Sequence, residues 1–343
     1  MTDRWIYWLE ELGQEHNDLV GKKCANLGEM TKLGMRVPPG FAISVDGFQR
    51  YMTLTGLGQR LGEYFASLGP DLKDSIQKQM DASGVAKELF AETPLPVEMA
   101  QEVERSYEML CTRYTIDDVP VAVRSSGAVS MPGQMETFLQ VRGSTEVKRR
   151  LLDVWESTFT TRAIAFRLEK GLPVAKAPIG VAVIKMVNAK SAGVVLTVDP
   201  TSGDLDRVVV EGNWGLGESV VSGEITPDHF VVAKSDLAIE RTVSRKTRWV
   251  VPTPHGTVKA DVPPELCDKP CLTDQEIRQI VQVALSVEEH FGAPQDMEWV
   301  VDADAAFPQS VIWVQARPAR FVPHRKDADA DYLVDQMARL FRS

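Results

Sequence analysis

The pattern of hydrophobic and polar positions changes about halfway along the chain. In the first half, the stretch from Pro96 to about Tyr114 has the amphipathic spacing of a helix and contains no helix breaker. A short strand is predicted at 119–123, and a further helical segment opens at Ser144 and runs towards Gly171. Residues 172–178 have the composition of a linker. We therefore predict a mainly helical N-terminal lobe, 1–175, with few strands.

The second half is rich in valine and favours β-structure. Candidate strands lie at 179–187, 193–198 and 207–211, where β-branched residues dominate. One helix interrupts them, because the capping box Thr273–Glu276 precedes apolar residues at 277, 280, 284, 287 and 291. We predict a C-terminal lobe at 176–322. Residues 323–343, charged and alanine-rich before a short amphipathic stretch, are typical of a linker or docking tail.

Strict alternation at the end of this lobe predicts a hairpin. Residues 296–301 and 311–318 each alternate polar and apolar positions, and 302–310 can form the turn. Asp296 and Glu298 then share a face of one strand, and Gln315 and Arg317 share a face of the other. Two carboxylates, an amide oxygen and a guanidinium suit a hard divalent cation that carries a polyphosphate. A salt-bridged, solvent-exposed face is the alternative explanation of the same residues.

Composition narrows the class of protein. The net charge of -10 and the pI near 5.2 argue against non-specific nucleic-acid binding. No apolar run approaches the length needed to span a bilayer, and the N-terminus lacks a signal-peptide pattern. The four scattered cysteines, 24, 111, 267 and 271, fit a reducing compartment. We expect a cytoplasmic protein that binds neither nucleic acid nor membrane.

Three glycine-containing segments are candidates for anion binding. In 20–30 a lysine lies at a Gly-containing turn just before a predicted helix, where free N–H groups favour negative charge, although an exposed lysine is the simpler explanation. In 121–139 a strand delivers Arg124 into a loop of small residues whose backbone can approach phosphate. The alternative is a polar surface loop. The third segment, 213–223, lacks the dinucleotide spacing, and a turn between strands explains it almost as well.

Taken together, the ordered motifs resemble a known family. They are Gly-Lys-Lys-Cys-Ala-Asn-Leu-Gly-Glu (21–29), Val-Pro-Pro-Gly-Phe (37–41), Val-Arg-Ser-Ser (123–126), Met-Pro-Gly-Gln-Met-Glu-Thr-Phe-Leu (131–139), Thr-Arg-Ala-Ile-Ala-Phe-Arg (161–167), Gly-Leu-Gly-Glu (215–218), Gln-Asp-Met-Glu-Trp (295–299) and Gln-Ala-Arg-Pro (315–318). The chain resembles, from about Leu19 to about Arg320, the N-terminal nucleotide-binding region of phosphoenolpyruvate synthase, pyruvate phosphate dikinase and the rifampicin phosphotransferases.

The resemblance implies an α/β (α+β) fold of the ATP-grasp-like kind, in which two lobes clamp ATP and Mg²⁺. It implies phosphate-binding roles for Lys23, Arg124 and Arg317, and magnesium ligation by Glu298 and Gln315. Further nucleotide contacts are implied for Lys22, Gly133, Gln134, Met135, Thr137, Lys185, Met186, Val187 and Asp296. The family's usual Gly-Gly-Lys-Gly turn is here Gly-Lys-Lys-Cys, so either Lys22 or Lys23 could reach the phosphate.

The histidines bear on the function. None of the five, at 16, 229, 255, 290 and 324, has the small-residue setting of the family's phospho-accepting histidine. We therefore expect an ATP-binding subunit that works with a phosphohistidine-domain partner, as in phenylphosphate synthase or 4-methylbenzyl phosphate synthase. The β-phosphoryl group of ATP would pass to the partner's histidine, with release of AMP and phosphate, and then to a phenol- or benzyl-alcohol-type acceptor bound on the partner. The alternatives are a component of a split phosphoenolpyruvate synthase or dikinase, or a non-catalytic nucleotide sensor.

Overall fold

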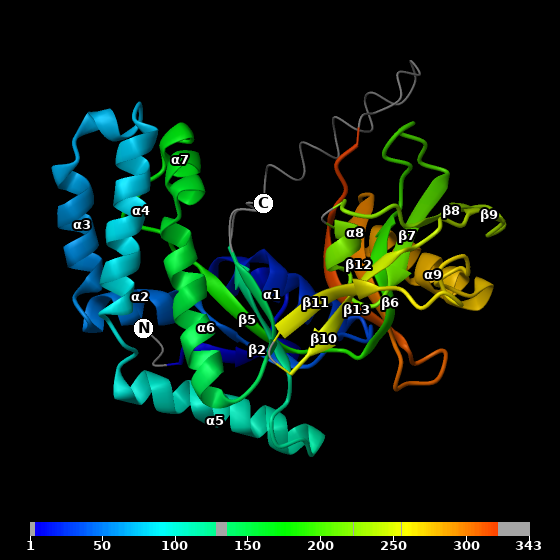
Figure 1. Cartoon of the computed structure of the whole chain (residues 1–343), viewed down its shortest axis with the longest axis horizontal. Coiled ribbons are helices and arrows are strands. Elements are labelled where there is room, and N and C mark those ends of the chain that lie inside the picture. The colour runs from blue at the N-terminus through cyan, green and yellow to red at the C-terminus, as the bar shows by residue number, and fades with distance from the viewer. Residues whose placement is uncertain (1–3, 128–135, 222, 255, 322–343) are drawn as a thin grey trace. The chain divides into compact units, whose positions relative to one another are not determined.

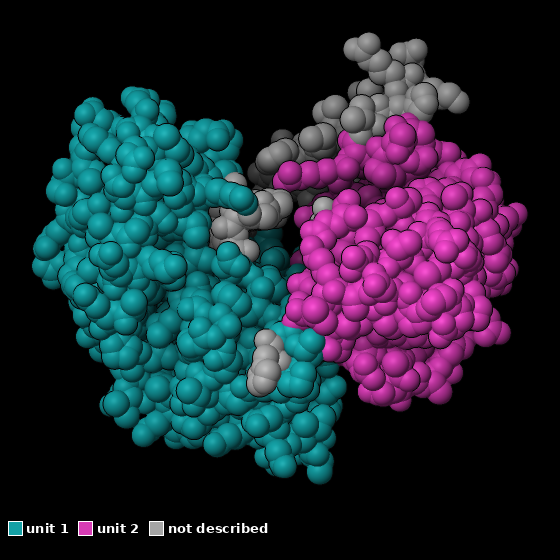
Figure 2. All heavy atoms as spheres, in the orientation of Figure 1, with its two compact units in different colours: residues 1–34, 38–186, 253–256 teal, residues 35–37, 187–252, 257–343 magenta. Residues whose placement is uncertain are grey.

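The computed structural model describes residues 4–127, 136–221, 223–254 and 256–321, which form helices and antiparallel sheets (Figure 1). The contact pattern divides the chain into two compact units (Figure 2). Unit 1 comprises 1–34, 38–186 and 253–256, and unit 2 comprises 35–37, 187–252 and 257–343. The mixed α/β class predicted from the sequence is confirmed. No helix in the described part of the chain is long and apolar enough to cross a lipid bilayer.

Unit 1 is built on a five-stranded antiparallel sheet. Its order is β1 (Ile6–Trp8), β2 (Gly40–Ile43), β5 (Gly180–Lys185), β3 (Val121–Ser126) and β4 (Thr137–Val141). Strand β5 lies at the centre, although the predicted boundary at 175/176 assigned it to the other lobe. The chain passes between the units at Met186 instead. Composition marked the linker correctly as a loop, but it could not show which sheet the next strand joins.

One face of this sheet packs against a large helical core. The helices are α2 (Val45–Leu54), α3 (Leu57–Ser67), α4 (Ile76–Ala91), α5 (Val97–Tyr114), α6 (Ser144–Glu156) and α7 (Thr161–Glu169), with short 3-10 turns at Leu9–Glu11, Gln14–His16, Pro70–Leu72 and Ser157–Phe159. Alternate residues of the strands, such as Val123 and Val183, join a cluster with Tyr51 and Trp155, whose rings stack at 5.0 Å. The predicted helix at 96–114 is confirmed, whereas the segment after Ser144 is divided into α6 and α7.

Helix α1 (Asn17–Lys32) packs against the strands of the sheet and is broken within. Small side chains lie beneath it: a Cβ at Gly180 would come within 2.5 Å of the Val20 carbonyl oxygen. Ala42 and Ala182, which face each other across β2 and β5, are almost fully buried. Gly21 has non-helical dihedral angles, φ 77° and ψ 161°, so a regular helix begins only at Lys22. The start of the regular part of α1 therefore lies against the five-stranded sheet.

Unit 2 contains a six-stranded antiparallel sheet. Its order is β13 (Val311–Pro318), β12 (Gln295–Asp302), β6 (Ala189–Leu196), β7 (Arg207–Trp214), β8 (Asp228–Ala233) and β9 (Ile239–Thr242). Helix α9 (Asp274–Phe291) packs against its central strands. The predicted capping box is confirmed, because the Thr273 amide donates to Glu276 Oε2 at 2.8 Å and the Glu276 amide donates to Thr273 Oγ1 at 3.3 Å.

Two glycines fix the packing of this sheet around one tryptophan. The Trp299 side chain is fully buried, and a Cβ at Gly193 or at Gly212 would approach its ring within 2.7 Å. Trp299 follows Glu298 on β12, so its burial orients that strand and turns Glu298 to the opposite, half-exposed face. The position of Glu298 therefore follows from tight packing on the other side of the strand.

The segment Gly-Leu-Gly-Glu is a structural turn at the end of β7. Gly215 has φ 75°, and a Cβ there would lie 2.4 Å from the Val250 carbonyl oxygen, so only glycine fits. The Leu216 amide donates to that carbonyl at 2.9 Å. Val250 belongs to β10 (Arg248–Thr253), which pairs with β11 (Gly256–Asp261), and the short helix α8 (Glu218–Val221) follows the turn. A turn at this position therefore explains why glycine is required at Gly215.

Candidate functional site

The predicted site residues fall in both units. Unit 1 carries those of the lysine turn, the Arg124 strand and the end of β5, whereas unit 2 carries Val187 and the residues of the hairpin. Three predicted residues, Gly133, Gln134 and Met135, lie outside the residues that the structure describes. Thr137 follows them as the first residue of β4 and is exposed.

The lysine turn has the predicted form of a glycine followed by a helix. Lys22 is exposed and Lys23 is half-buried, at the first two positions of the regular helix. Gly21 has the left-handed φ that glycine adopts at little cost. A Cβ at Gly21 would also lie 2.0 Å from the Ser126 carbonyl oxygen. The backbone of α1 thus touches strand β3 at a point where no side chain can be accommodated.

Two hydrogen bonds join this helix start to β3. The Lys22 amide donates to the Gly127 carbonyl oxygen at 3.1 Å, and the Cys24 amide donates to Ser126 Oγ at 3.1 Å. We call this contact between 21–24 and 126–127 the helix–strand joint. The expectation that free N–H groups at this helix start bind an anion is therefore wrong for the amides of Lys22 and Cys24. An anion at this helix start would therefore be attracted mainly by side-chain charge.

Arg124 lies on the same side of the sheet as the joint. It pairs in register with Thr137 on β4 and Ala182 on β5, so these three side chains share the face opposite Val123. Burial raises the pKa of the Cys24 thiol to about 11, and the positive charges of Lys23 and Arg124 partly oppose this rise. Both cations are therefore close enough to the Cys24 thiol at the joint to lower its pKa.

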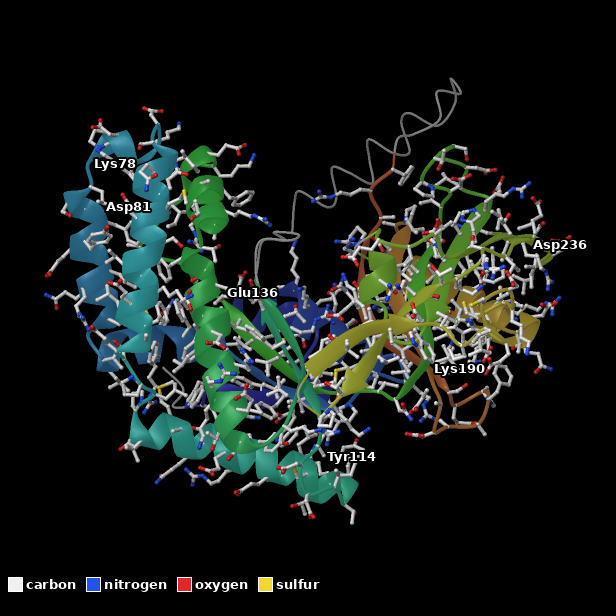
Figure 3. All side chains as sticks on the ribbon, in the orientation of Figure 1. Lys78, Asp81, Tyr114, Glu136, Lys190 and Asp236 are labelled. Atoms are coloured by element: carbon white, nitrogen blue, oxygen red, sulfur yellow. The ribbon has the colours of Figure 1, made fainter. Side chains whose placement is uncertain are left out.

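The end of β5 differs from the expectation for a nucleotide-binding strand. Lys185 pairs with Val121, so its side chain points to the helical core, opposite to Arg124. Its ammonium group lies 5.6 Å from the centre of the Tyr114 ring. Tyr114 is the last residue of α5 (Figure 3). The Lys185 and Met186 amides already donate to the carbonyl oxygens of Pro39 and Pro120, each at 2.8 Å. A nucleotide base would have to use other groups of this segment.

Val187 begins a small apolar cluster in unit 2. It is nearly buried together with Ala192, Val300 and Ile312, and Ala189 and Val314 pack against them. Val300 and Ile312 belong to the two strands of the predicted hairpin. The cluster therefore adjoins the residues predicted to bind metal, two positions along β12 from Glu298.

The predicted hairpin is confirmed. Strands β12 and β13 pair with Glu298 opposite Gln315 and with Asp296 opposite Arg317. All four side chains thus lie on one face, because directly opposed residues in an antiparallel pair point the same way. A bulge after Glu298 shifts the register.

Asp296 and Arg317 form an ion pair. Arg317 Nε donates to Asp296 Oδ2 at 2.9 Å, and a terminal guanidinium nitrogen lies 2.7 Å from the same oxygen. The carboxylate is 18% exposed and the guanidinium 46%. The alternative explanation, a salt-bridged surface, therefore holds for this pair. In the next pair, a carboxylate faces an amide.

The Glu298–Gln315 pair fits a magnesium ion that is bound together with a nucleotide. Both side chains are half-buried, and the Cα atoms of such a directly opposed pair lie about 5 Å apart. A carboxylate and an amide oxygen are therefore presented side by side. Mg²⁺ prefers oxygen ligands, keeps several waters and commonly uses only one or two protein groups beside substrate phosphates. The described residues contain no group of three or more His, Cys, Asp or Glu arranged to hold a metal. The donor set is thus sufficient only with phosphate or water as additional ligands.

Sequence reasoning missed the partners of the lysine helix. Ser126 and Gly127 were interpreted as part of a phosphate-binding loop, whereas both bind α1. A glycine at the start of a helix, which has no capping oxygen of its own, was the available signal.

Comparisons with known proteins agree with the resemblance. Residues 17–337 match the family model described as pyruvate phosphate dikinase, AMP/ATP-binding domain. The chain is 39% identical over 323 residues to a protein of Methanothermobacter thermautotrophicus named "Probable phosphoenolpyruvate synthase", with 92% of this chain and 46% of that protein covered. It is 34% identical over 363 residues to the "Phosphoenolpyruvate synthase" of Aeropyrum pernix, with 95% and 44% covered. The chain thus spans less than half the length of these relatives, and it belongs to the family of pyruvate phosphate dikinase AMP/ATP-binding domains.

Proposed function

We propose that this chain is the ATP-binding component of a dikinase-type phosphotransferase, with an ATP-grasp-like fold. The β-phosphoryl group of ATP would be transferred to a histidine of a partner subunit, and a phenol- or benzyl-alcohol-type molecule bound on that partner would be the final acceptor. The observation that carries the proposal is the register of β12 and β13, which sets Glu298 against Gln315 beside Asp296–Arg317 in a chain of this family.

Unit 1 supplies positive charge for the polyphosphate. Lys23 and Arg124 both act on the joint, and phosphoryl transfer depends mainly on positioning and on neutralising charge. Lys23 is the better candidate of the two lysines, because it is half-buried and influences Cys24, whereas Lys22 is exposed. Thr137 is in register with Arg124 and places a hydroxyl on the same face.

Unit 2 supplies the oxygen ligands. Glu298 and Gln315 would hold Mg²⁺, which when bound neutralises phosphate charge. Asp296 fixes the Arg317 guanidinium by two contacts to one oxygen, and guanidinium has further N–H donors that suit phosphate oxygens. Asp296 therefore orients Arg317, while Glu298 and Gln315 bind.

The transfer balances with water as the one further reactant. A nitrogen of the partner's imidazole forms a bond to the β-phosphorus, the bond from that phosphorus to the α-phosphate oxygen breaks, and AMP leaves. Hydrolysis then releases the γ-phosphate as inorganic phosphate. The residues of this chain hold the nucleotide and stabilise charge during the first step.

A split phosphoenolpyruvate synthase is the second candidate, because both relatives described above carry that name. The two candidates share the same nucleotide site and the same first step. They differ only in the acceptor. Pyruvate and a phenol are each added to the complete assembly, and the molecule that becomes phosphorylated identifies the acceptor.

Product analysis tests the proposal. The chain is incubated with MgATP, alone and with its co-purified partner, and adenine nucleotides and phosphate are quantified. AMP and phosphate formed only with the partner support the proposal. ADP formed by the chain alone would indicate an ordinary kinase, and no turnover in either case would favour a nucleotide sensor.

A further inference from the structure

We infer that Ser126 is a positioning residue for the phosphate-binding lysine. Its hydroxyl caps the helix that carries Lys23, from the strand that carries Arg124, and so fixes the two cations relative to each other. The part of this inference that concerns ATP rests on the proposed function.

The helix start requires a cap that its own sequence cannot provide. The first amides of a helix have no partner within it, and a side chain at the preceding position usually accepts from the second or third of them. Gly21 occupies that preceding position and has no side chain. No other residue fits there, because a Cβ would lie 2.0 Å from the Ser126 carbonyl oxygen. The close approach that excludes a local cap also brings Ser126 into range.

Ser126 takes over this role. Cys24 is the third residue of the regular helix, and its amide donates to Ser126 Oγ at 3.1 Å across a sequence separation of 102 residues. Ser126 is fully buried, so water does not replace the hydroxyl. The Lys22 amide is held by the carbonyl of the next residue, Gly127.

The geometry couples the two cations. Lys23 lies between the two anchored amides, and Arg124 lies two residues before Ser126 on the same face of β3. Loss of one anchor lowers the fraction of molecules in which both cations are in place. The apparent affinity for a ligand that needs both falls by that fraction.

A matched set of variants tests the inference in the full chain. Ser126→Ala removes the cap, and Ser126→Thr keeps an oxygen at the same position. Ser125→Ala removes a hydroxyl of similar burial, 5% exposed, from the opposite face of the same strand. Calorimetric titration with a non-hydrolysable MgATP analogue should show binding weakened about three- to tenfold in Ser126→Ala. Ser126→Thr and Ser125→Ala should stay within about twofold of wild type.

A second readout is independent of the nucleotide. Hydrogen exchange of the Cys24 amide, measured on its peptide by mass spectrometry, should accelerate in Ser126→Ala and remain unchanged in Ser125→Ala. In the wild-type chain the Cys24 amide should exchange hydrogen as slowly as the amides of β3. This measurement requires no variant, so it decides the capping contact even if Ser126→Ala does not fold.

Several results would overturn the inference. One is a Ser126→Ala chain that binds the analogue as wild type does, and another is a Ser125→Ala chain that is weakened equally. A third is fast exchange of the Cys24 amide. If the wild-type chain fails to bind the analogue at all, the proposed function fails, whereas the exchange results still decide the role of Ser126.

Discussion

The lysine–arginine site of unit 1 and the hairpin of unit 2 are built in opposite ways. In the hairpin, four polar residues lie within 22 positions of sequence and are brought together by one turn and by alternation. In unit 1, Lys23 and Arg124 are a hundred positions apart, and a helix–strand joint holds them. The fold of the hairpin should therefore tolerate substitution of the side chains that are proposed to bind ligands. The geometry of the joint should be altered even by substitutions of residues that contact no ligand.

The largest effect is expected from Gly21→Ala. The new methyl group meets the Ser126 backbone at 2.0 Å and the residue keeps φ 77°, so we expect a loss of roughly 3–5 kcal/mol in unfolding free energy. Gly56→Ala is the matched control, because Gly56 has φ 71° but no atom within 4 Å, and roughly 1–2 kcal/mol is expected. Urea unfolding measures both. Equal losses would show that strain, and not contact, dominates at the joint.

The next effect concerns catalysis in the hairpin. On the proposed function, Glu298→Ala should lower AMP formation with the partner by about a hundredfold, since it removes a charge that would hold the magnesium–phosphate group. Its thermal stability should change little, because Glu298 is half-buried on the outer face. Glu289→Ala, on an exposed position of α9, is the control. Wild-type AMP formation by Glu298→Ala would remove the metal site from this face.

Cys24 provides a test of burial at the joint. Its pKa is raised from 9.0 to about 11, so at pH 8 the folded chain holds about a hundredfold less thiolate than the unfolded chain. The rate of alkylation should rise with pH up to about 11 in the folded state and level off near 9 in urea. Because the folded state favours the protonated thiol, this group also makes stability fall as pH rises from 9 to 11. A folded-state rate that levels off near pH 9 would contradict the burial.

The smallest effect is expected from the ion pair of the hairpin. Asp296→Ala should change the unfolding free energy by less than about 1 kcal/mol, since the Arg317 guanidinium is 46% exposed. Glu240→Ala, which breaks the exposed pair with Arg207, should behave in the same way. Thermal unfolding of both variants is sufficient. A loss above about 2 kcal/mol in Asp296→Ala alone would mean that the pair is structural.

The sequence predicted best what depends on neighbours in sequence. Alternation located β12 and β13 with their facing residues, and a capping box located the start of α9. It predicted less where partners are distant. Strand β5 is buried on both sides, so its sequence does not alternate between polar and apolar residues. The sequence therefore cannot indicate that β5 lies between β2 and β3.

The candidate site shows the same division. Glu298 and Gln315 were assigned to one surface from the sequence, whereas the role of Ser126 depends on a contact with Cys24 that no local pattern contains. The direction of the Lys185 side chain follows from its register with Val121, which is again set by strand order.

The fit between Gly21 and Ser126 has a consequence for protein engineering. The segment that carries the lysine helix, 17–32, is sterically complementary to 121–127. Gly21 has no side chain, and the Ser126 backbone occupies the space that a side chain would need. Chimaeras between family members should therefore exchange both segments together. A chimaera that exchanges only one would inherit a helix start without its cap.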